Sequence, residues 1–238
     1  WVVAWGIHCA ELVPDGWRDL AQAGAGTVES ELLQEWLRRH DGQESPFKFS
    51  FEIPEIREVG GWLVQFAPGR GGKRALGKRA TSLREAFNPQ GFHFGKVRDS
   101  EVLGPVAGAE DSTSVIINVS PAGAFHMLLV PWVDEMLPQC WVARGFEEAL
   151  QVSRHLSNSS LLTFNSIGAG ASVNHFHWQL MYAWESFPLE RAEQRQLGAC
   201  PPSRARSVEW PVHVVVVPAG EDAVQAVDAV VSAAVELG

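Results

Sequence analysis

Two histidines and a glutamine alternate with large apolar residues between positions 174 and 179, where the chain reads Asn-His-Phe-His-Trp-Gln. Because successive side chains of a β-strand point to opposite faces, a strand here puts His175, His177 and Gln179 on one face. The opposite face then carries apolar side chains and suits a hydrophobic core. The polar face is either a solvated surface or a site that carries out chemistry, and the surrounding chain favours chemistry.

A metal site is the first interpretation of the two histidines. Histidines two residues apart on a strand are common zinc or iron ligands, but such a site needs a third ligand, usually a carboxylate. In cupin-type sites a glutamate follows the second histidine by four or five residues, and here Met181 and Tyr182 occupy those positions. Glu185 comes later, and His126 is a distant candidate for the third ligand. We expect no metal, although this interpretation stays open.

Nucleophilic catalysis is the second interpretation. An imidazole can attack a phosphorus centre when a neighbour, often a backbone carbonyl, holds its other nitrogen in the right tautomer. An amide N–H can stabilise the charge that develops on the phosphoryl oxygens, but an amide cannot act as a general base. Gln179 therefore favours phosphorus transfer to an acceptor that is already ionised over the activation of water.

A module without activity is the third interpretation. Such a module binds a nucleotide or a protein partner, and an inactive paralogue can keep most of the pocket of an enzyme. The residues of this sequence leave that alternative open beside the other two.

The size and charge of the chain restrict its class. Its 238 residues, 46% of them hydrophobic, can bury a core of full domain size, in one large domain or two small ones. The formal charge of −9 argues against general affinity for nucleic acid, which needs a basic surface. An acidic protein can still bind a small anion in a locally basic pocket.

The cysteines and the apolar segments indicate a cytoplasmic protein. Cys9, Cys140 and Cys200 are far apart and odd in number, which is typical of free thiols in a reducing compartment. The apolar segment 1–13 lacks the features of a signal peptide. The uncharged segment 112–133 is interrupted by polar and turn residues, which favour a hairpin over a membrane span. We therefore expect no membrane partner.

The periodicity of the remaining chain predicts an α+β fold. The central part reads as a hairpin, a helix and a further strand pair, an order that predicts an antiparallel sheet with packed helices. The predicted division is a helical segment 1–44, a catalytic unit 45–190, and a third part 191–238. The predicted strands are 47–53, 61–66, 115–119, 125–130, 161–164, the histidine strand from 174, and 210–217. The predicted helices are 27–40, 143–156 and 221–236. Residues 165–170 are predicted to form a glycine-rich bend, and residues 191–206 a linker or exposed loop.

Two segments of the chain resemble the two halves of the histidine-triad signature. The first is Asn118-Val-Ser-Pro121 followed by His126, and the second runs from Asn165 to Gln179. Glutamine in the last triad position resembles the nucleotidyltransferase branch, which includes galactose-1-phosphate uridylyltransferase. Across most of residues 45–235 the sequence is similar to the GDP-hexose phosphorylases that act on GDP-D-glucose or GDP-L-galactose, in the blocks 61–65, 87–97, 117–121, 137–139, 164–168, 173–179 and 187–190.

The resemblance implies a histidine-triad-like fold and a reaction without metal or cofactor. In that reaction His177 attacks the α-phosphorus of a GDP-hexose and releases hexose 1-phosphate, and inorganic phosphate then removes the guanylyl group as GDP. Gln179 holds a phosphoryl oxygen, and His126 lies beside the α-phosphate as an electrostatic partner. The full set that it implies is His126, His175, His177 and Gln179 for catalysis, with Asn165, Ser172, Asn174, Lys78 and Arg79 for binding the nucleotide and phosphate.

The sequence departs from the family pattern at three places. Phe125 stands where the family usually has glycine before the hairpin histidine, and Ala80 stands where relatives tend to have proline. A bulky ring at position 125 is expected to crowd the pocket or to shift His126. The family also continues beyond this sequence, so we expect 191–238 to be a linker plus the start of an incomplete second half, in a fragment or a shortened paralogue.

Overall fold

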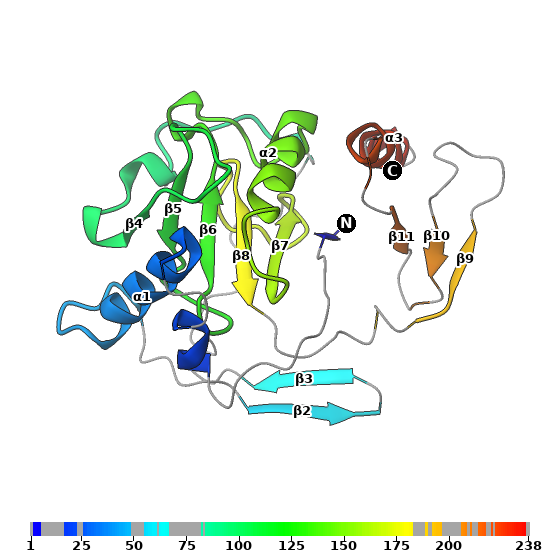
Figure 1. The fold of residues 1–238 in the computed structure, drawn as a ribbon. Helices are drawn as coiled ribbons and strands as arrows, with labels where there is room; N and C mark the ends of the chain where they lie inside the picture. Colours follow the sequence, from blue (N-terminus) through cyan, green and yellow to red (C-terminus); the bar gives the residue numbers. More distant parts are fainter. Residues whose placement is uncertain are drawn as a thin grey trace. The chain divides into compact units, whose positions relative to one another are not determined.

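The computed structural model describes residues 2–5, 17–22, 26–48, 55–60, 62–66, 82, 84–182, 189, 192–196, 206–208, 210, 214–217, 220 and 222–236. Their backbone forms an α+β fold around a six-stranded sheet in the order β1-β7-β8-β6-β5-β4 (Figure 1). Every neighbouring pair in this sheet is antiparallel, which confirms the predicted fold class. Its strands are β1 (Val2–Trp5), β4 (Val102–Gly104), β5 (Ser114–Ile117), β6 (Met127–Val130), β7 (Ser160–Asn165) and β8 (Trp178–Tyr182).

The predicted hairpin is present as β5 and β6, with Ser114 opposite Val130 and Ile117 opposite Met127. All four side chains of β6 are buried, so this strand is central to the core. Both strands are shorter than the sequence predicts, because Pro121 lacks an N–H for a ladder and Phe125 has a φ of 53°. The residues between the strands are thereby released to form part of a site.

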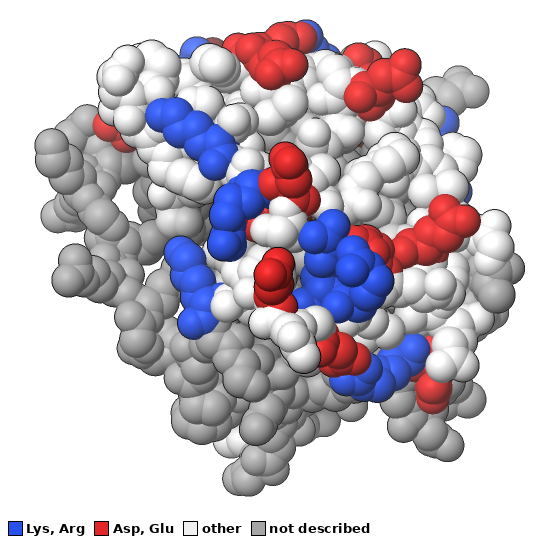
Figure 2. All heavy atoms as spheres, turned by 90° about the vertical axis from the view of Figure 1, so that its left-hand side faces the viewer, with Lys and Arg blue, Asp and Glu red and all other residues white. Residues whose placement is uncertain are grey.

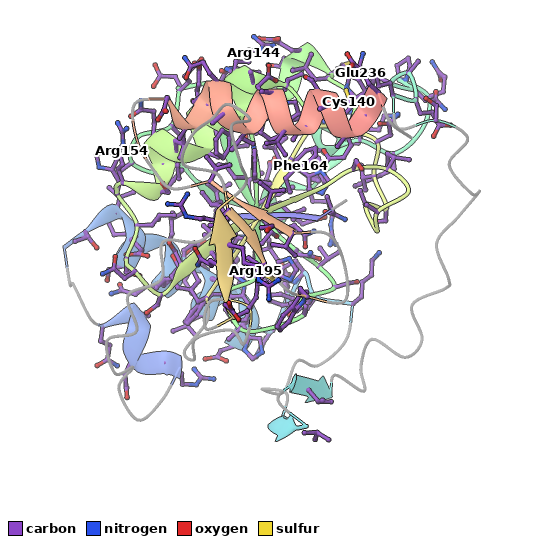
Figure 3. All side chains as sticks on the ribbon, turned by 90° about the vertical axis from the view of Figure 1, so that its right-hand side faces the viewer. Cys140, Arg144, Arg154, Phe164, Arg195 and Glu236 are labelled. Atoms are coloured by element: carbon purple, nitrogen blue, oxygen red, sulfur yellow. The ribbon has the colours of Figure 1, made fainter. Side chains whose placement is uncertain are left out.

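The histidine strand begins later than the sequence predicts. The extended ladder of β8 starts at Trp178, so His175 and His177 precede the strand in a bend. The prediction that both histidines lie in the strand is therefore wrong. The alternation of faces nevertheless persists, because Phe176 and Trp178 both pack on Phe164 (Figure 3). The ring centroid of Phe176 lies 5.6 Å from that of Phe164, and the ring centroid of Trp178 lies 5.2 Å from it.

Helix α1 (Val28–Asp41) confirms the predicted N-terminal helix. Thr27 caps it by accepting a hydrogen bond from Ser30 N–H, and Trp36 is fully buried on its apolar face. Helix α2 (Ala143–Ser153) ends three residues earlier than predicted, and α3 (Ala223–Glu236) agrees with the predicted C-terminal helix. Short 3-10 helices are η1 (Trp17–Ala21), η3 (Phe94–Lys96), η4 (Asp99–Glu101) and η5 (Val133–Glu135).

The chain divides into two compact units. The first comprises residues 1–56, 65–140 and 148–185 and contains the six-stranded sheet; the second comprises 57–64, 141–147 and 186–238. The predicted boundaries at residues 44 and 190 stay a prediction. The expected strand at 47–53 is absent at its two described residues, 47 and 48, while 49–53 lie outside the described part of the chain.

The second unit holds the three-stranded sheet β11-β10-β9, formed by β9 (Gln194–Gln196), β10 (Arg206–Val208) and β11 (Val214–Val216). Figure 3 labels Arg195 on β9 and Glu236 at the end of α3. The prediction of a linker over 191–206 is wrong where β9 lies, because β9 and β11 both pair with β10. A hairpin of β2 (Glu55–Val59) and β3 (Trp62–Phe66) completes the described elements, and β3 matches its prediction.

Opposite charges alternate on the face of the protein that Figure 2 presents. Ion pairs in the first unit include Arg18 with Asp41 and Arg98 with Glu101. On this face the described cations are interspersed with anions. None of the described helices is both long and apolar enough to cross a bilayer.

Candidate active site

His177 is held at one ring nitrogen and at its backbone N–H. Its Nδ1 lies 2.7 Å from the carbonyl oxygen of His175, and its own N–H donates to Oε1 of Gln139 over 2.7 Å. A carbonyl oxygen can only accept, so Nδ1 carries the proton and Nε2 carries the lone pair. Nε2 is therefore the ring atom that is able to act as a nucleophile.

Burial keeps His177 neutral. The pKa of His177 is lowered from 6.5 to about 4, mainly because burial desolvates the ring; the hydrogen bond to the His175 carbonyl raises the pKa, and the neighbouring His175 ring lowers it. At neutral pH the imidazole is then uncharged and its Nε2 lone pair is available. The sequence-based expectation of a backbone carbonyl that sets the tautomer corresponds to this geometry.

A cavity of about 340 Å³ lies beside His177 in the first unit. Since Nδ1 is occupied at the backbone, the Nε2 edge of the ring is the polar edge left for a ligand. Apolar side chains from η3 and from β5 and β6 form one wall. The polar lining consists of Lys48, Glu101, Asn118, Ser120, Ser172, His177 and Gln179.

A series of hydrogen bonds through His126 and Asn165 orients the amide of Gln179. Ala122 N–H donates to Nδ1 of His126 over 2.9 Å, His126 Nε2 lies 3.0 Å from Gln179 Oε1, and Gln179 Nε2 donates to Asn165 Oδ1 over 2.6 Å. Asn165 Nδ2 then donates to the carbonyl of Ala169 over 3.3 Å. Because the series begins at a backbone donor and ends at a backbone acceptor, the direction of every bond in it is determined. The second N–H of the Gln179 amide is left for a ligand oxygen.

Asn118 presents a donor to the cavity. Its Oδ1 accepts a hydrogen bond from Ser120 N–H over 3.0 Å, which identifies the other atom of the amide as Nδ2. Nδ2 lies 3.1 Å from His126 Nε2, which already carries the proton directed at Gln179. Two N–H groups cannot bond each other, so the contact is steric and the Asn118 amide protons are able to bind an anion.

His126 and Asn165 support the site without lining the cavity. Both bond to Gln179, and neither belongs to the cavity lining. His126 Nδ1 accepts from a backbone N–H, so the ring in this arrangement is the neutral tautomer with its proton on Nε2. The role of His126 as an electrostatic partner beside the α-phosphate stays a prediction.

His175 lies next to His177 in the chain but faces a different environment. Its Nδ1 accepts a hydrogen bond from Phe94 N–H over 3.0 Å, and its ring stacks on Phe94 at 5.5 Å. Burial lowers the pKa of His175 to about 4, with a further contribution from His93. His175 is not among the residues that line the cavity, and its predicted catalytic role stays a prediction.

The predicted binding residues are divided between the cavity and its support. Ser172 is exposed and lines the cavity. Asn174 accepts from Gln139 N–H over 2.9 Å and donates to the carbonyls of Glu85 and Ala86, so its amide is engaged with backbone. Lys78 and Arg79 lie outside the described residues, and their role stays a prediction.

Lys48 and Gln139 are two of the residues that sequence reasoning missed as members of the site; others are Phe92, Glu101, Asn118 and Ser120 in the cavity lining. Lys48 N–H donates to the carbonyl of Val119 over 2.9 Å, which brings this residue to the cavity from a distant part of the chain. No local motif marks Lys48, since only the fold brings it there. Gln139 belongs to the block 137–139 that carried part of the family resemblance, and that block was the available signal.

The expectation that Phe125 crowds the pocket is wrong. Its ring is fully buried and contacts Trp36 at 5.2 Å and Tyr182 at 5.9 Å. Phe125 is not part of the cavity lining. The left-handed φ of 53° turns the side chain toward α1, so the hairpin accommodates the ring in the core and His126 keeps its bonds.

The described residues include no group of three or more His, Cys, Asp or Glu side chains that could hold a metal ion. His126, the distant third ligand of the metal interpretation, is engaged with Gln179 and with Ala122 N–H. Of the three cysteines, Cys140 is a free thiol whose pKa is raised by burial, and Cys9 and Cys200 lie outside the described residues.

Known proteins similar to this chain are enzymes that act on GDP-hexoses. GDP-L-galactose phosphorylase 1 of Arabidopsis thaliana is 31% identical over 195 residues, covering 71% of this chain and 43% of the relative. GDP-D-glucose phosphorylase 1 of Homo sapiens is 35% identical, and the match covers 58% of this chain and 38% of the relative. The Bos taurus enzyme of the same name is 34% identical, and the match covers 71% of this chain and 46% of the relative. The chain therefore spans less than half the length of these three relatives.

A solved structure and a family model complete the comparison. The crystal structure of yeast Ap4A phosphorylase Apa2 in complex with AMP matches with a TM-score of 0.42 and 19% identity, covering 66% of this chain and 52% of that one. The family model described as GDPGP1-like, N-terminal domain matches residues 27–181, which include the whole cavity lining described above. This chain belongs to the GDPGP1-like family, the GDP-hexose phosphorylases that its two histidine-containing segments resemble.

Proposed function

We propose that the chain is a nucleotidyltransferase that converts a GDP-hexose and inorganic phosphate into hexose 1-phosphate and GDP. One observation carries the proposal: His177 is a neutral imidazole whose Nδ1 proton is fixed on the His175 carbonyl and whose Nε2 edge is left for the cavity. Family membership supports the substrate class, because the similar proteins are named for GDP-D-glucose and GDP-L-galactose.

In the first step the Nε2 lone pair of His177 attacks the α-phosphorus. An N–P bond forms and the bond between the α-phosphorus and the bridging oxygen breaks, with its electron pair leaving on hexose 1-phosphate. The imidazole becomes cationic, and the His175 carbonyl 2.7 Å from Nδ1 stabilises that charge. A sugar phosphate is a stable anion, so this step requires no strong general acid.

The polar lining of the cavity suits the charge that develops on the α-phosphoryl oxygens. Gln179 has one amide N–H left after its bond to Asn165, and the amide protons of Asn118 lie near it through their shared neighbour His126. Lys48 adds a cation at the same cavity. Donors that are already oriented stabilise developing charge without reorganising, which is the main electrostatic source of catalysis.

In the second step inorganic phosphate attacks the α-phosphorus of the guanylyl-histidine. The N–P bond breaks, its electron pair returns to Nε2 of His177, and GDP leaves. Phosphate is ionised at neutral pH and needs no base. Gln179 cannot deprotonate water, so transfer to phosphate is favoured over hydrolysis.

Phe92 offers a surface for the guanine base. Its ring is 59% exposed, lines the cavity and meets Phe94 edge-on at 6.1 Å. An exposed aromatic ring at the edge of a polar cavity is suited to stacking on a purine, because every base has a π-face. The base would then lie on the aromatic wall, with the phosphates toward Lys48.

Trapping the covalent intermediate tests the proposal. The protein is incubated with GDP-glucose, and in parallel with GDP-L-galactose, without phosphate, and digested peptides are examined for the mass of GMP. We expect the adduct on the peptide that contains His177, its loss in His177→Ala, and its release as GDP when phosphate is added. His155→Ala, at an exposed histidine outside the cavity, is the matched control and should retain the adduct. Binding of GDP without adduct or turnover would instead identify a binding module.

A further inference from the structure

Gln139 is a buried side chain that bonds to the backbone of the nucleophile. It is 1% exposed, and its Oε1 accepts the N–H of His177 over 2.7 Å. Its Nε2 donates to the carbonyl of His177 over 3.0 Å and to the carbonyl of Asn165 over 2.9 Å. One amide therefore satisfies both backbone groups of His177 and one of Asn165.

These backbone groups lie where the sheet ends. The pairing of β8 with β6 starts at Trp178 opposite Leu129, and its pairing with β7 starts at Gln179 opposite Thr163. His177 precedes this ladder, so its buried N–H and C=O need other partners, and an unpaired buried group costs about 1–3 kcal/mol. Gln139 occupies the place that a strand neighbour would otherwise fill.

The segment that carries Gln139 is itself anchored to the same bend. Phe176 N–H donates to the carbonyl of Leu137 over 2.8 Å, and Gln139 N–H donates to Oδ1 of Asn174 over 2.9 Å. Segment 137–139 is thus hydrogen-bonded to the residues that precede β8, although it is not itself a strand of the sheet. Only an amide of this length supplies an acceptor and two donors without charge, so its chemistry is specific to the task.

We propose that Gln139 is a positioning residue for His177. It fixes the backbone of His177 so that the ring can reach the His175 carbonyl with Nδ1 and the cavity with Nε2, and it does so without adding a charge next to the nucleophile. The inference rests on the proposed function for the role of His177, but the effect on the ring of His177 is measurable without any reaction.

Two variants separate positioning from simple structural support. Gln139→Leu keeps the volume and removes the three hydrogen bonds of the Gln139 side chain, which displaces the nucleophile. A misplacement of about 1 Å costs roughly 100-fold in rate. We therefore expect kcat to fall by about that factor while KM for the GDP-hexose stays within about threefold. Gln139→Glu adds a carboxyl that, when protonated, accepts from His177 N–H and replaces one of the two bonds that the amide donates; when ionised it donates none, so the activity of this variant should fall as pH rises. Gln151→Leu and Gln151→Glu, at an exposed glutamine of α2, are the matched controls.

The spectroscopic readout is the pair of ring ¹⁵N signals of histidine-labelled protein. In the wild type we expect the Nδ1–H tautomer for His177, assigned by its loss in His177→Asn. Gln139→Leu should shift these signals toward a mixture of tautomers, and the carboxylate of Gln139→Glu should raise the pKa of His177, because a nearby negative charge favours the imidazolium.

Wild-type kcat together with unchanged His177 signals in both folded Gln139 variants would overturn the inference. If Gln139→Leu does not fold, the pH dependence and the His177 signals of Gln139→Glu decide in its place. The two proposals fail separately. Absence of a guanylyl adduct in the wild type removes the proposed function, while a tautomer change confined to the Gln139 variants still supports the positioning role.

Discussion

Acidification between pH 7 and pH 5 should destabilise the folded chain through His177. In the unfolded chain a histidine has a pKa near 6.5, whereas burial lowers the pKa of folded His177 to about 4. Below pH 6.5 the unfolded state therefore binds more protons than the folded state, so stability falls as pH falls. For one group with these two values, linkage gives a loss of about 2 kcal/mol between pH 7 and pH 5.

The perturbation that isolates His177 is His177→Asn, which removes the titrating ring but keeps a donor for the His175 carbonyl. Urea unfolding followed by tryptophan fluorescence, at pH 7, 6 and 5, gives the free energy of unfolding. We expect the wild type to lose at least about 2 kcal/mol, with His175 acting in the same direction, and the variant to lose about 2 kcal/mol less than the wild type. His155→Asn, at an exposed histidine, is the control.

The two carboxylates with strongly lowered pKa values do not contribute to the change in stability between pH 7 and pH 5. Glu35 and Asp41 have pKa values lowered by hydrogen bonds to Arg38 and Arg18, respectively. The stabilisation that they contribute is lost only below their unfolded values near 4, so it is constant between pH 7 and pH 5. An identical pH dependence in the wild type and in His177→Asn would refute the claim that the fold holds this imidazole neutral.

Substitutions at four further positions test the surroundings of the site. Phe125→Gly should destabilise the chain less than Phe125→Ala, by about 1 kcal/mol in chemical denaturation, because both lose the ring and only glycine adopts a φ of 53° without strain. Lys48→Met should raise KM for phosphate roughly tenfold in steady-state assays at unchanged stability, because a charged hydrogen bond is lost from the cavity. Gln179→His should raise the ratio of GMP to GDP among the products, because an imidazole can activate water. Phe92→Ala should raise KM for the GDP-hexose about tenfold in the same assays through loss of base stacking.

The local patterns of the sequence were sufficient for most elements of the fold. The helical spacing of Leu32, Leu33 and Trp36 predicts the buried face of α1, and the alternation around His177 predicts two faces that the structure keeps. Patterns were insufficient at the boundaries. The start of β8 depends on where β6 and β7 can pair, and β9 is a strand because β10 pairs with it.

The sequence by itself determined the chemical groups of the candidate site, two imidazoles and an amide at alternate positions, and the blocks that place the chain in its family. Only the tertiary structure decided how these groups are used. It buries His175 and brings Lys48 to the cavity. It also places the ring of His126 within hydrogen-bond distance of Gln179, and the side chain of Gln139 within hydrogen-bond distance of the His177 backbone. The physical reason is that a tautomer, a desolvated imidazole and an occupied hydrogen bond each depend on neighbours that are distant in the chain, and a local pattern contains no information about them.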